Sequence, residues 1–227
     1  MHYLLNGGGR EFQSLASPEV SDWLHAVGVK NILIVAFALK EDYWQKIWAT
    51  PPAQISLSDM NLSSLSMVSY TKLLAKSCLA QADAVWFPGG SPEVLLSRVR
   101  STGFLELLLA AQANSSLKVI GGASAGEMAL GQRTVVGKQT VSDVVGAMGV
   151  IPGHLFDSHF SDRGRLSRLK AVIDNEPQLT GVGIDENTSL ILDAAYQPQA
   201  IFGPGTVTYY NAHKEPVTYH AKTQFRT

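Results

Sequence analysis

The stretch from Val119 to Leu130 places the strongest constraint on the fold, because three kinds of local structure follow one another within it. An apolar, β-branched run leads to Ser124, Gly122 and Gly126 flank this serine, and a helix-forming run comes next. The pattern predicts a strand, a sharp turn and a helix, with the serine hydroxyl above the carboxyl end of the strand. Backbone N–H groups at the helix N-terminus would face any anion formed there. Gly-x-Ser-x-Gly in this setting favours a nucleophile elbow over a glycine-rich turn that serine merely caps.

Upstream of this stretch, apolar runs alternate with helical patterns. The predicted strands are Tyr3–Leu5, Asn31–Ala38, Leu65–Tyr70 and Ala84–Phe87, and the predicted helices are 17–28, Thr71–Gln81 and a long region from Ser91 to Ala113. Alternation of this kind predicts a parallel sheet with helices on both faces. Ligands bind outside the carboxyl ends of such strands, so Gly7–Gly9, Gly89–Gly90 and Ser124 are expected to converge there. The Gly7–Gly9 run is either a wall of that crevice or a flexible strand end.

The pattern changes after Gly131, where short strands predominate. The segments with strand patterns are Thr134–Val136, Gln139–Val145, His154–Phe160, Gly181–Ile184, Ser189–Leu192, Ala200–Tyr210 and Pro216–His220, with a loop predicted at Val150–Gly153 and a helix at Arg163–Asp174. No stretch has the composition of a linker. We therefore expect one α/β domain over residues 1–227, with a three-layer α/β/α architecture and a mostly parallel central sheet.

Composition narrows the function classes. Hydrophobic residues make up 45% of the chain and charged residues 16%, which is enough for a substantial core. The formal net charge of -1 provides no basic surface for nucleic acid or an anionic membrane, and no apolar run is long enough to span a bilayer. The lone cysteine, Cys78, fits a reducing compartment, so a cytoplasmic location is expected. No histidine pair or carboxylate cluster has the spacing of metal ligands, so we expect no metal and no organic cofactor.

A serine nucleophile needs a base and a group that orients the base. His154 and His159 are the candidate bases, because the other four histidines lie far from the predicted site or in the C-terminal tail; both remaining histidines lie in one strand-like segment. Side chains alternate along a strand, so Asp157 and His159 would share one face, with His159 better placed at the carboxyl end. Glu186, directly after an apolar strand, is a candidate for the orienting acid, and Asp157 and Asp185 compete with it. The order serine, histidine, acid differs from that of the α/β-hydrolases.

Four motifs, in chain order, resemble the successive motifs of the S51 serine peptidases, a family that includes aspartyl dipeptidase and cyanophycinase. The motifs are Phe87–Gly90, Gly122–Gly126, Asp157–Leu169 and Gly183–Thr188. The resemblance implies a fold similar to class I glutamine amidotransferases. It also implies Ser124 as nucleophile, His159 as base and Glu186 as third member of the triad, with Gly90 and Ala125 as N–H donors of an oxyanion hole. Serine in place of the amidotransferase cysteine argues against glutamine hydrolysis.

Three arginines follow the proposed base. Arg165 and Arg168 are three positions apart on one face of the predicted helix, and Arg163 lies at its start. Guanidinium groups in this arrangement bind a carboxylate through paired hydrogen bonds, although arginines also occur on solvated helix faces. We count these arginines and Asp157 as candidate substrate-binding residues. The Arg-x-Arg-x-x-Arg run resembles that of cyanophycinase. Cyanophycinase usually has glutamine immediately before the histidine, where this chain has Ser158. The compact chain is also closer in length to the dipeptidase.

These features predict a serine exopeptidase or dipeptidase that hydrolyses small peptides with an acidic, aspartyl residue. One alternative is a cyanophycinase-like isopeptidase that cleaves β-aspartyl-arginine units. The other is a non-catalytic, amidotransferase-like binding module, which an intact serine, histidine and glutamate set disfavours. The expected partner is a small peptide, neither nucleic acid nor a membrane is expected to bind, and a homodimer is compatible with the sequence.

Overall fold

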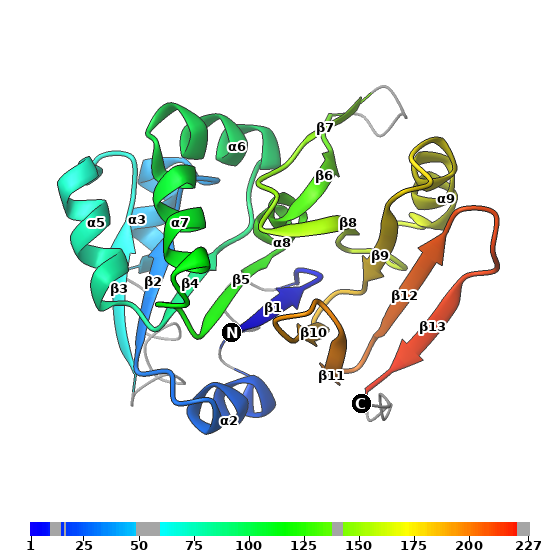
Figure 1. Cartoon of the computed structure of the whole chain (residues 1–227), viewed down its shortest axis with the longest axis horizontal. Coiled ribbons are helices and arrows are strands. Elements are labelled where there is room, and N and C mark those ends of the chain that lie inside the picture. The colour runs from blue at the N-terminus through cyan, green and yellow to red at the C-terminus, as the bar shows by residue number, and fades with distance from the viewer. Residues whose placement is uncertain (10–14, 16, 49–59, 138–142, 222–227) are drawn as a thin grey trace.

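The computed structural model describes residues 1–9, 15, 17–48, 60–137 and 143–221, and a sheet runs through the middle of them (Figure 1). Seven strands of this described part pair in the order β11 (Pro198–Phe202), β10 (Ser189–Leu192), β1 (His2–Asn6), β5 (Val119–Ala123), β4 (Ala84–Phe87), β2 (Asn31–Val35) and β3 (Asn61–Leu65). The strands from β1 across to β3 pair in parallel, and β10 and β11 extend the sheet in antiparallel pairing. The predicted, mostly parallel sheet is confirmed.

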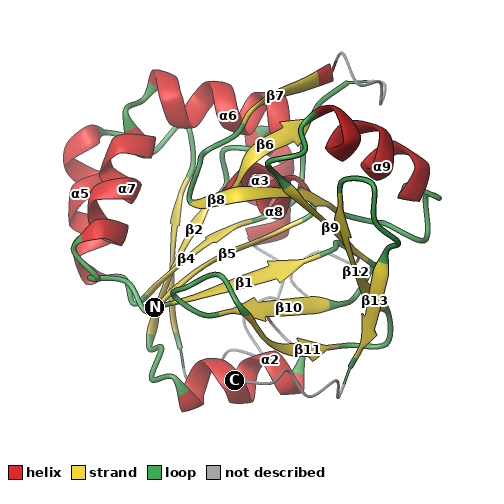
Figure 2. Ribbon diagram, turned by 45° about the vertical axis from the view of Figure 1, so that its right-hand side comes forward, coloured by secondary structure: helices red, strands yellow, loops and turns green. Residues whose placement is uncertain are grey.

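Helices cover both faces of this sheet (Figure 2). Successive side chains of a strand point to opposite faces, so both faces carry apolar side chains that pack against helices. The helices are α2 (Pro18–Ala26) and α3 (Glu41–Trp48) on one face, and α5 (Lys72–Gln81), α6 (Pro92–Ser101), α7 (Phe104–Ala113) and α8 (Ala125–Leu130) on the other. Leu4 of β1 is buried with Leu24 of α2, whereas the next residue, Leu5, is buried with Phe104 of α7. This is the expected α/β/α layering. No helix in the described ranges is both long and apolar enough to cross a membrane.

A second, six-stranded sheet lies beside the first within the described residues. Its order is β13 (Val217–His220), β12 (Thr206–Asn211), β9 (Thr180–Ile184), β8 (Ile151–Asp157), β6 (Gly131–Val135) and β7 (Val144–Gly146), and α9 (Leu166–Asn175) packs against it. One face contributes Phe156, Val182 and Val207 to the buried cluster that also holds Leu5 of β1. The opposite face packs against Leu169 of α9. The two sheets therefore share one core. The strand patterns did not predict that the strands divide between two sheets.

The two Ser-Pro-Glu sequences begin helices, as predicted. Ser17 Oγ accepts a hydrogen bond from the Val20 N–H and Ser91 Oγ accepts one from the Val94 N–H, each at 3.3 Å. Such caps stabilise a helix by about 0.5–2 kcal/mol. Because α6 begins immediately after its cap, its N-terminus directly follows the Gly89–Gly90 turn.

Two upstream segments differ from the predictions. The long helix expected from Ser91 to Ala113 is two helices, because Gly103 takes a left-handed φ of 72° between α6 and α7. The strand expected at Leu65–Tyr70 is also wrong, since β3 ends at its first residue. The next residues form a turn in which the Ser66 N–H donates to Ser69 Oγ at 3.0 Å.

The boundaries of the strand before the proposed base also differ. The loop expected at Val150–Gly153 is wrong, because β8 already begins at Ile151. The strand expected at His154–Phe160 ends at Asp157. Most of the strand expected at Gln139–Val145 falls on residues outside the described ranges, and β7 begins at 144.

Candidate active site

Ser124 lies in a sharp turn between β5 and α8, with a backbone φ of 49°. A positive φ costs a residue with a Cβ about 1–3 kcal/mol, so the surroundings must hold it. The Ser124 N–H donates a hydrogen bond to the Asn6 carbonyl at 2.9 Å. A Cβ on Gly122 would lie 2.6 Å from the backbone carbon of Gly126, and a Cβ on Gly126 would overlap the Phe87 carbonyl. Glycine on both sides therefore allows the turn that lifts the hydroxyl above β5.

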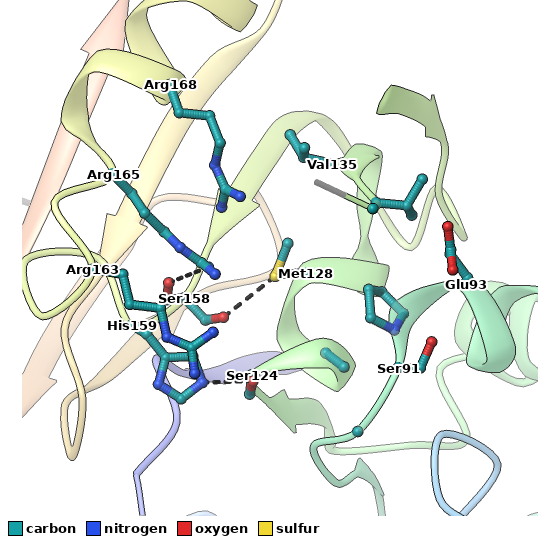
Figure 3. A pocket seen from close by; sticks show the side chains of 15 residues that line it. Ser91, Glu93, Ser124, Met128, Val135, Ser158, His159, Arg163, Arg165 and Arg168 are labelled. Atoms are coloured by element: carbon teal, nitrogen blue, oxygen red, sulfur yellow. Dashed lines mark hydrogen bonds between the residues drawn. The ribbon is translucent and has the colours of Figure 1, made fainter. Parts of the chain in front are cut away.

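His159 lies between Ser124 and Glu186. Its Nε2 is 2.8 Å from Ser124 Oγ, and its Nδ1 is 2.6 Å from Glu186 Oε1. Figure 3 shows the first of these contacts at the edge of a pocket. The three side chains come from the turn after β5, the turn after β8 and the loop between β9 and β10. The structure thus brings together the serine, histidine and glutamate that the sequence singled out.

His159 occupies a turn rather than a strand, with a backbone φ of 48°. The alternation argument that favoured it is wrong, because β8 ends at Asp157 and does not continue to Phe160. The turn directs the imidazole toward Ser124. The other candidate base, His154, lies within β8, and its Nδ1 is 2.8 Å from the Pro152 carbonyl.

The glycine loop after β1, Gly7–Gly9, holds this turn in place. The His159 N–H donates to the Gly7 carbonyl at 2.7 Å, and the Asn187 N–H donates to the Gly8 carbonyl at 2.8 Å. A Cβ on Gly8 would overlap the His159 ring, so only glycine lets the loop approach so closely. The loop is therefore neither free nor merely a strand end. It connects the histidine turn to the glutamate loop.

The competing acids bind other groups. Asp185 accepts hydrogen bonds from the Ser161 N–H at 2.9 Å, the Thr206 N–H at 2.8 Å and Thr206 Oγ1 at 2.7 Å. Its carboxylate therefore ties the histidine turn to β12. Asp157 is fully buried and pairs with arginines. Of the three candidates, Glu186 is the acid at His159.

The surroundings favour the neutral form of His159. Burial lowers the pKa of its imidazole below the ordinary 6.5, and the positive charges of Arg163 and Arg165 act in the same direction. The hydrogen bond to Glu186 opposes this shift. A neutral imidazole can accept a proton from a serine hydroxyl at neutral pH, which is what a general base requires.

A cavity of about 230 Å³ opens beside the serine hydroxyl (Figure 3). Gly90 and Ala125 border it together with Ser124 and His159. Ala125 is the first residue of α8, so its N–H has no partner within the helix. The two predicted oxyanion donors therefore border the same cavity as the serine. Within the described residues, no group of three or more His, Cys, Asp or Glu side chains could hold a metal ion.

All three predicted arginines line this cavity, but two of them bind Asp157. Arg165 Nη1 donates to Asp157 Oδ1 at 2.9 Å, and Arg168 donates to both oxygens of the same carboxylate, from Nε at 2.9 Å and from Nη2. Arg163 makes no side-chain hydrogen bond or ion pair within the described part of the chain. The expectation that Asp157 binds substrate is not met, because its side chain is only 1% exposed and does not line the cavity. Arg163 and Arg165 also precede α9, which begins at 166.

The model of peptidase family S51 matches residues 3–195. The chain belongs to this family. Two solved structures share the S51 fold over nearly the whole chain. A peptidase from an acI-B1 actinobacterium has a TM-score of 0.71 at 18% identity and covers 96% of both chains. A structure from Listeria monocytogenes EGD-e described as a Peptidase E protein has a TM-score of 0.61 at 14% identity, covering 97% of this chain and 98% of that one.

Curated relatives of this S51 chain include two cyanophycinases. That of Geminocystis herdmanii is 32% identical over 110 residues, which is 45% of this chain and 40% of that protein. That of Synechococcus elongatus is 30% identical over 142 residues, which is 60% of this chain and 44% of that protein. The matches span less than half the length of these relatives.

One buried acid of this S51 chain was not assigned a role from the sequence. Glu127 is fully buried on α8, one turn after Ser124, and neither carboxyl oxygen has a hydrogen-bond partner within the described residues. Burial, and next the negative charge of Asp157, raise its pKa well above the ordinary value, although Arg165 opposes the shift. A buried carboxylate without partners is costly, which is the physical reason that the pKa of this carboxyl lies above its ordinary value. Its place on α8 was predictable, but its lack of partners depends on the packing around it.

Proposed function

We propose that the protein is a serine exopeptidase that hydrolyses small peptides carrying an aspartyl residue. The observation that supports this most is the continuous contact from Ser124 Oγ through the His159 ring to Glu186 Oε1, at 2.8 Å and 2.6 Å, beside a cavity lined by arginines. A nucleophile, its base and the orienter of that base need this arrangement.

The first half of the proposed reaction forms an acyl-enzyme. Ser124 Oγ attacks the carbonyl carbon of the scissile bond while His159 Nε2 takes the hydroxyl proton. Glu186 accepts the hydrogen bond from Nδ1–H and thereby stabilises the imidazolium. The N–H groups of Gly90 and Ala125 would donate to the oxyanion of the tetrahedral intermediate. His159 then returns its proton to the leaving amine, and the C–N bond breaks.

The second half releases the product and restores the enzyme. A water molecule gives a proton to His159 Nε2 and attacks the ester carbonyl. The oxyanion collapses, the bond to Ser124 Oγ breaks, and His159 returns the proton to that oxygen. The imidazole takes and returns a proton in each half of the reaction, so its ring must keep one orientation throughout, which is the role we assign to Glu186.

The cavity supports a small, acidic substrate. Its volume of about 230 Å³ is below the 300–1,000 Å³ that is typical of sites for drug-sized ligands, so one or two amino-acid residues fit better than an extended chain. Arg163 lines it and its guanidinium has no partner in the described residues. A substrate carboxylate would gain paired, charge-assisted hydrogen bonds from this group. Arg163 is therefore the arginine we assign to the aspartyl side chain.

A dipeptide panel tests this proposal. The panel contains Asp-X, Glu-X, Asn-X and β-Asp-Arg peptides, and Ser124→Ala serves as the inactive control. We expect Asp-X to be cleaved at least about tenfold more efficiently than Asn-X, since the neutral amide loses the charge-assisted bonds. A fluorophosphonate should label Ser124 in the wild type and nothing in Ser124→Ala. Hydrolysis without preference for Asp would contradict the specificity, and absence of labelling in an active enzyme would contradict the nucleophile.

Two observations favour a second candidate, cleavage of β-aspartyl-arginine. The curated relatives are named cyanophycinase. The cavity also holds one carboxylate, Glu93, on the opposite side from the arginines, where it could pair with an arginine of the leaving group (Figure 3). In the same panel, this candidate predicts that β-Asp-Arg is cleaved faster than Asp-X and that Glu93→Gln removes the difference. A binding module without turnover would bind peptides but would not react with the fluorophosphonate.

A further inference from the structure

We infer that Arg165 is a positioning residue that holds the turn carrying His159, rather than a residue that binds substrate. The inference rests on the proposed function, in which His159 is the base. It follows from where the side chain and the backbone of Arg165 make their hydrogen bonds, and from how deeply these groups are buried.

Arg165 contacts the chain on both sides of His159. Its side-chain Nη1 donates to the carbonyl of Ser158, the residue before the histidine, at 2.7 Å. Its backbone N–H donates to the carbonyl of Phe160, the residue after the histidine, at 3.0 Å. One residue therefore binds the peptide group directly before the base and the carbonyl of the residue after it, and Figure 3 shows the side chain extending toward Ser158.

The turn needs such a restraint. His159 has a positive φ of 48°, a conformation that a residue with a Cβ keeps only where its surroundings impose it. If the Ser158 carbonyl lost its donor, the turn could relax and carry Nε2 away from Ser124 Oγ. A displacement on the order of 1 Å at reacting atoms can reduce turnover about 100-fold.

The guanidinium of Arg165 pairs with a buried carboxylate that it shares with Arg168. The same Nη1 donates to Asp157 Oδ1 at 2.9 Å, and the arginine side chain is only 7% exposed. Binding a substrate carboxylate instead would leave a buried carbonyl, and part of a buried carboxylate, without a donor. These contacts assign Arg165 to the protein interior, although it borders the cavity.

Arg168 provides a matched control. It also donates to Asp157, its side chain is 9% exposed, and it also lines the cavity. It makes no hydrogen bond to Ser158 or Phe160 in the described structure. The two arginines therefore share the carboxylate and differ in the contact to the histidine turn.

The experiment compares Arg165→Met with Arg168→Met and Arg163→Met. Four quantities are measured: the rate of labelling by an uncharged fluorophosphonate, kcat and KM for the best peptide of the panel, and the thermal unfolding midpoint. For Arg165→Met we expect labelling and kcat to fall about 10- to 100-fold with KM changed less than about twofold, because geometry and not binding is lost. Arg168→Met should keep its labelling rate within about threefold. Arg163→Met should raise KM for acidic peptides, because it removes the guanidinium that we assign to the substrate carboxylate.

A spectroscopic readout makes the test independent of turnover. The proton shared by His159 Nδ1 and Glu186 Oε1, which lie 2.6 Å apart, should give a far-downfield proton resonance in the wild type. We expect Arg168→Met to keep this resonance and Arg165→Met to lose it. The resonance can be read even if every peptide of the panel proves not to be a substrate, so a failure of the proposed function is distinguishable from a failure of this inference.

Three results would overturn the inference. The first is an Arg165→Met enzyme with normal labelling and a KM raised selectively for acidic peptides, which would make Arg165 a substrate-binding residue. The second is an equal loss of labelling in Arg165→Met and Arg168→Met, which would trace the effect to Asp157. If Arg165→Met does not fold, Arg165→Lys replaces it. The lysine ammonium lacks the planar guanidinium, so labelling should fall several-fold at unchanged KM. Normal labelling of Arg165→Lys is the third result that would overturn the inference.

Discussion

At the scale of single residues, Glu186 contacts the proposed base through one carboxylate oxygen. Glu186→Gln keeps the size of the side chain but removes the charge that stabilises an imidazolium. We expect kcat to fall by at least about 100-fold, since members of such a set act as a unit. The glutamate side chain is 35% exposed, so the unfolding midpoint should change little. Steady-state kinetics and thermal unfolding measure the two effects.

Asp185→Asn is the control for this prediction, because Asp185 is the neighbouring acid that competed with Glu186. It bonds to Ser161 and Thr206 instead of to the base. We expect it to lower stability by about 1–3 kcal/mol, and to retain more turnover than Glu186→Gln. An inactive Asp185→Asn beside an active Glu186→Gln would reverse the assignment.

The pH dependence of kcat/KM follows from His159. Burial holds the pKa of this histidine below 6.5 in spite of its bond to Glu186. The base must be neutral to accept a proton, so kcat/KM should rise with pH to a midpoint below 6.5 and stay level through neutral pH. Arg163→Met removes a positive charge that lowers this pKa, and should move the midpoint upward. A wild-type midpoint above 6.5 would contradict the burial of the base.

Glu127 makes stability depend on pH in the opposite sense to a salt-bridged acid. Its pKa is higher in the folded protein than the ordinary 4.5 of the unfolded chain, so the folded state binds the extra proton. The resulting stability is fully present below pH 4.5 and is lost as pH rises toward the folded pKa, by up to about 1.4 kcal/mol for each pH unit. Glu127→Gln has no proton to lose. Urea unfolding at about pH 5 and about pH 8 measures the free energy of unfolding of both proteins. Relative to the wild type, Glu127→Gln should be more stable at about pH 8 than at about pH 5. The same difference in free energy at both pH values would mean that the pKa of Glu127 is not raised in the folded protein.

At the scale of elements, the loop after β1 restrains the turn after β8. In Gly8→Ala the new methyl group would overlap the His159 ring, and its φ of 96° adds backbone strain. Gly153→Ala is a matched control, because Gly153 also has a positive φ, 72°, but a Cβ added there would meet no described atom within 4 Å. We expect both variants to lose about 1 kcal/mol or more of stability, and only Gly8→Ala to lose turnover, by about tenfold or more. Equal activity in the two variants would mean that the loop does not position the histidine.

At the scale of the whole molecule, the two sheets share one buried cluster, which links their unfolding. All four tryptophans lie in or beside the first sheet, at 23, 44, 48 and 86, whereas Phe156 enters the shared cluster from the second sheet. Phe156→Ala should cost about 3–5 kcal/mol and should shift the unfolding midpoints seen by tryptophan fluorescence and by far-UV circular dichroism equally. A fluorescence midpoint that does not move would mean that the sheets unfold separately.

Much of the fold could be predicted because its signals are local. The caps at Ser17 and Ser91 act on N–H groups three residues away, and the apolar run before Ser124 reports a buried strand whatever its neighbours are. The break at Gly103 was missed because glycine after a helical pattern is compatible with either a continuing helix or two helices. The division into two sheets was missed because strand pairing joins residues that are distant in the chain.

The same distinction applies to the site. The sequence by itself determined the elbow at Ser124, since a strand, two glycines and a helix start are properties of adjacent residues. It also narrowed the base to two histidines and the acid to three carboxyls. Only the tertiary structure decided that Glu186 faces His159, that Asp157 instead pairs with Arg165 and that the loop after β1 contacts the turn of His159. These contacts form only where tertiary packing brings two side chains within hydrogen-bond distance of each other. The residue types along the chain do not specify those distances.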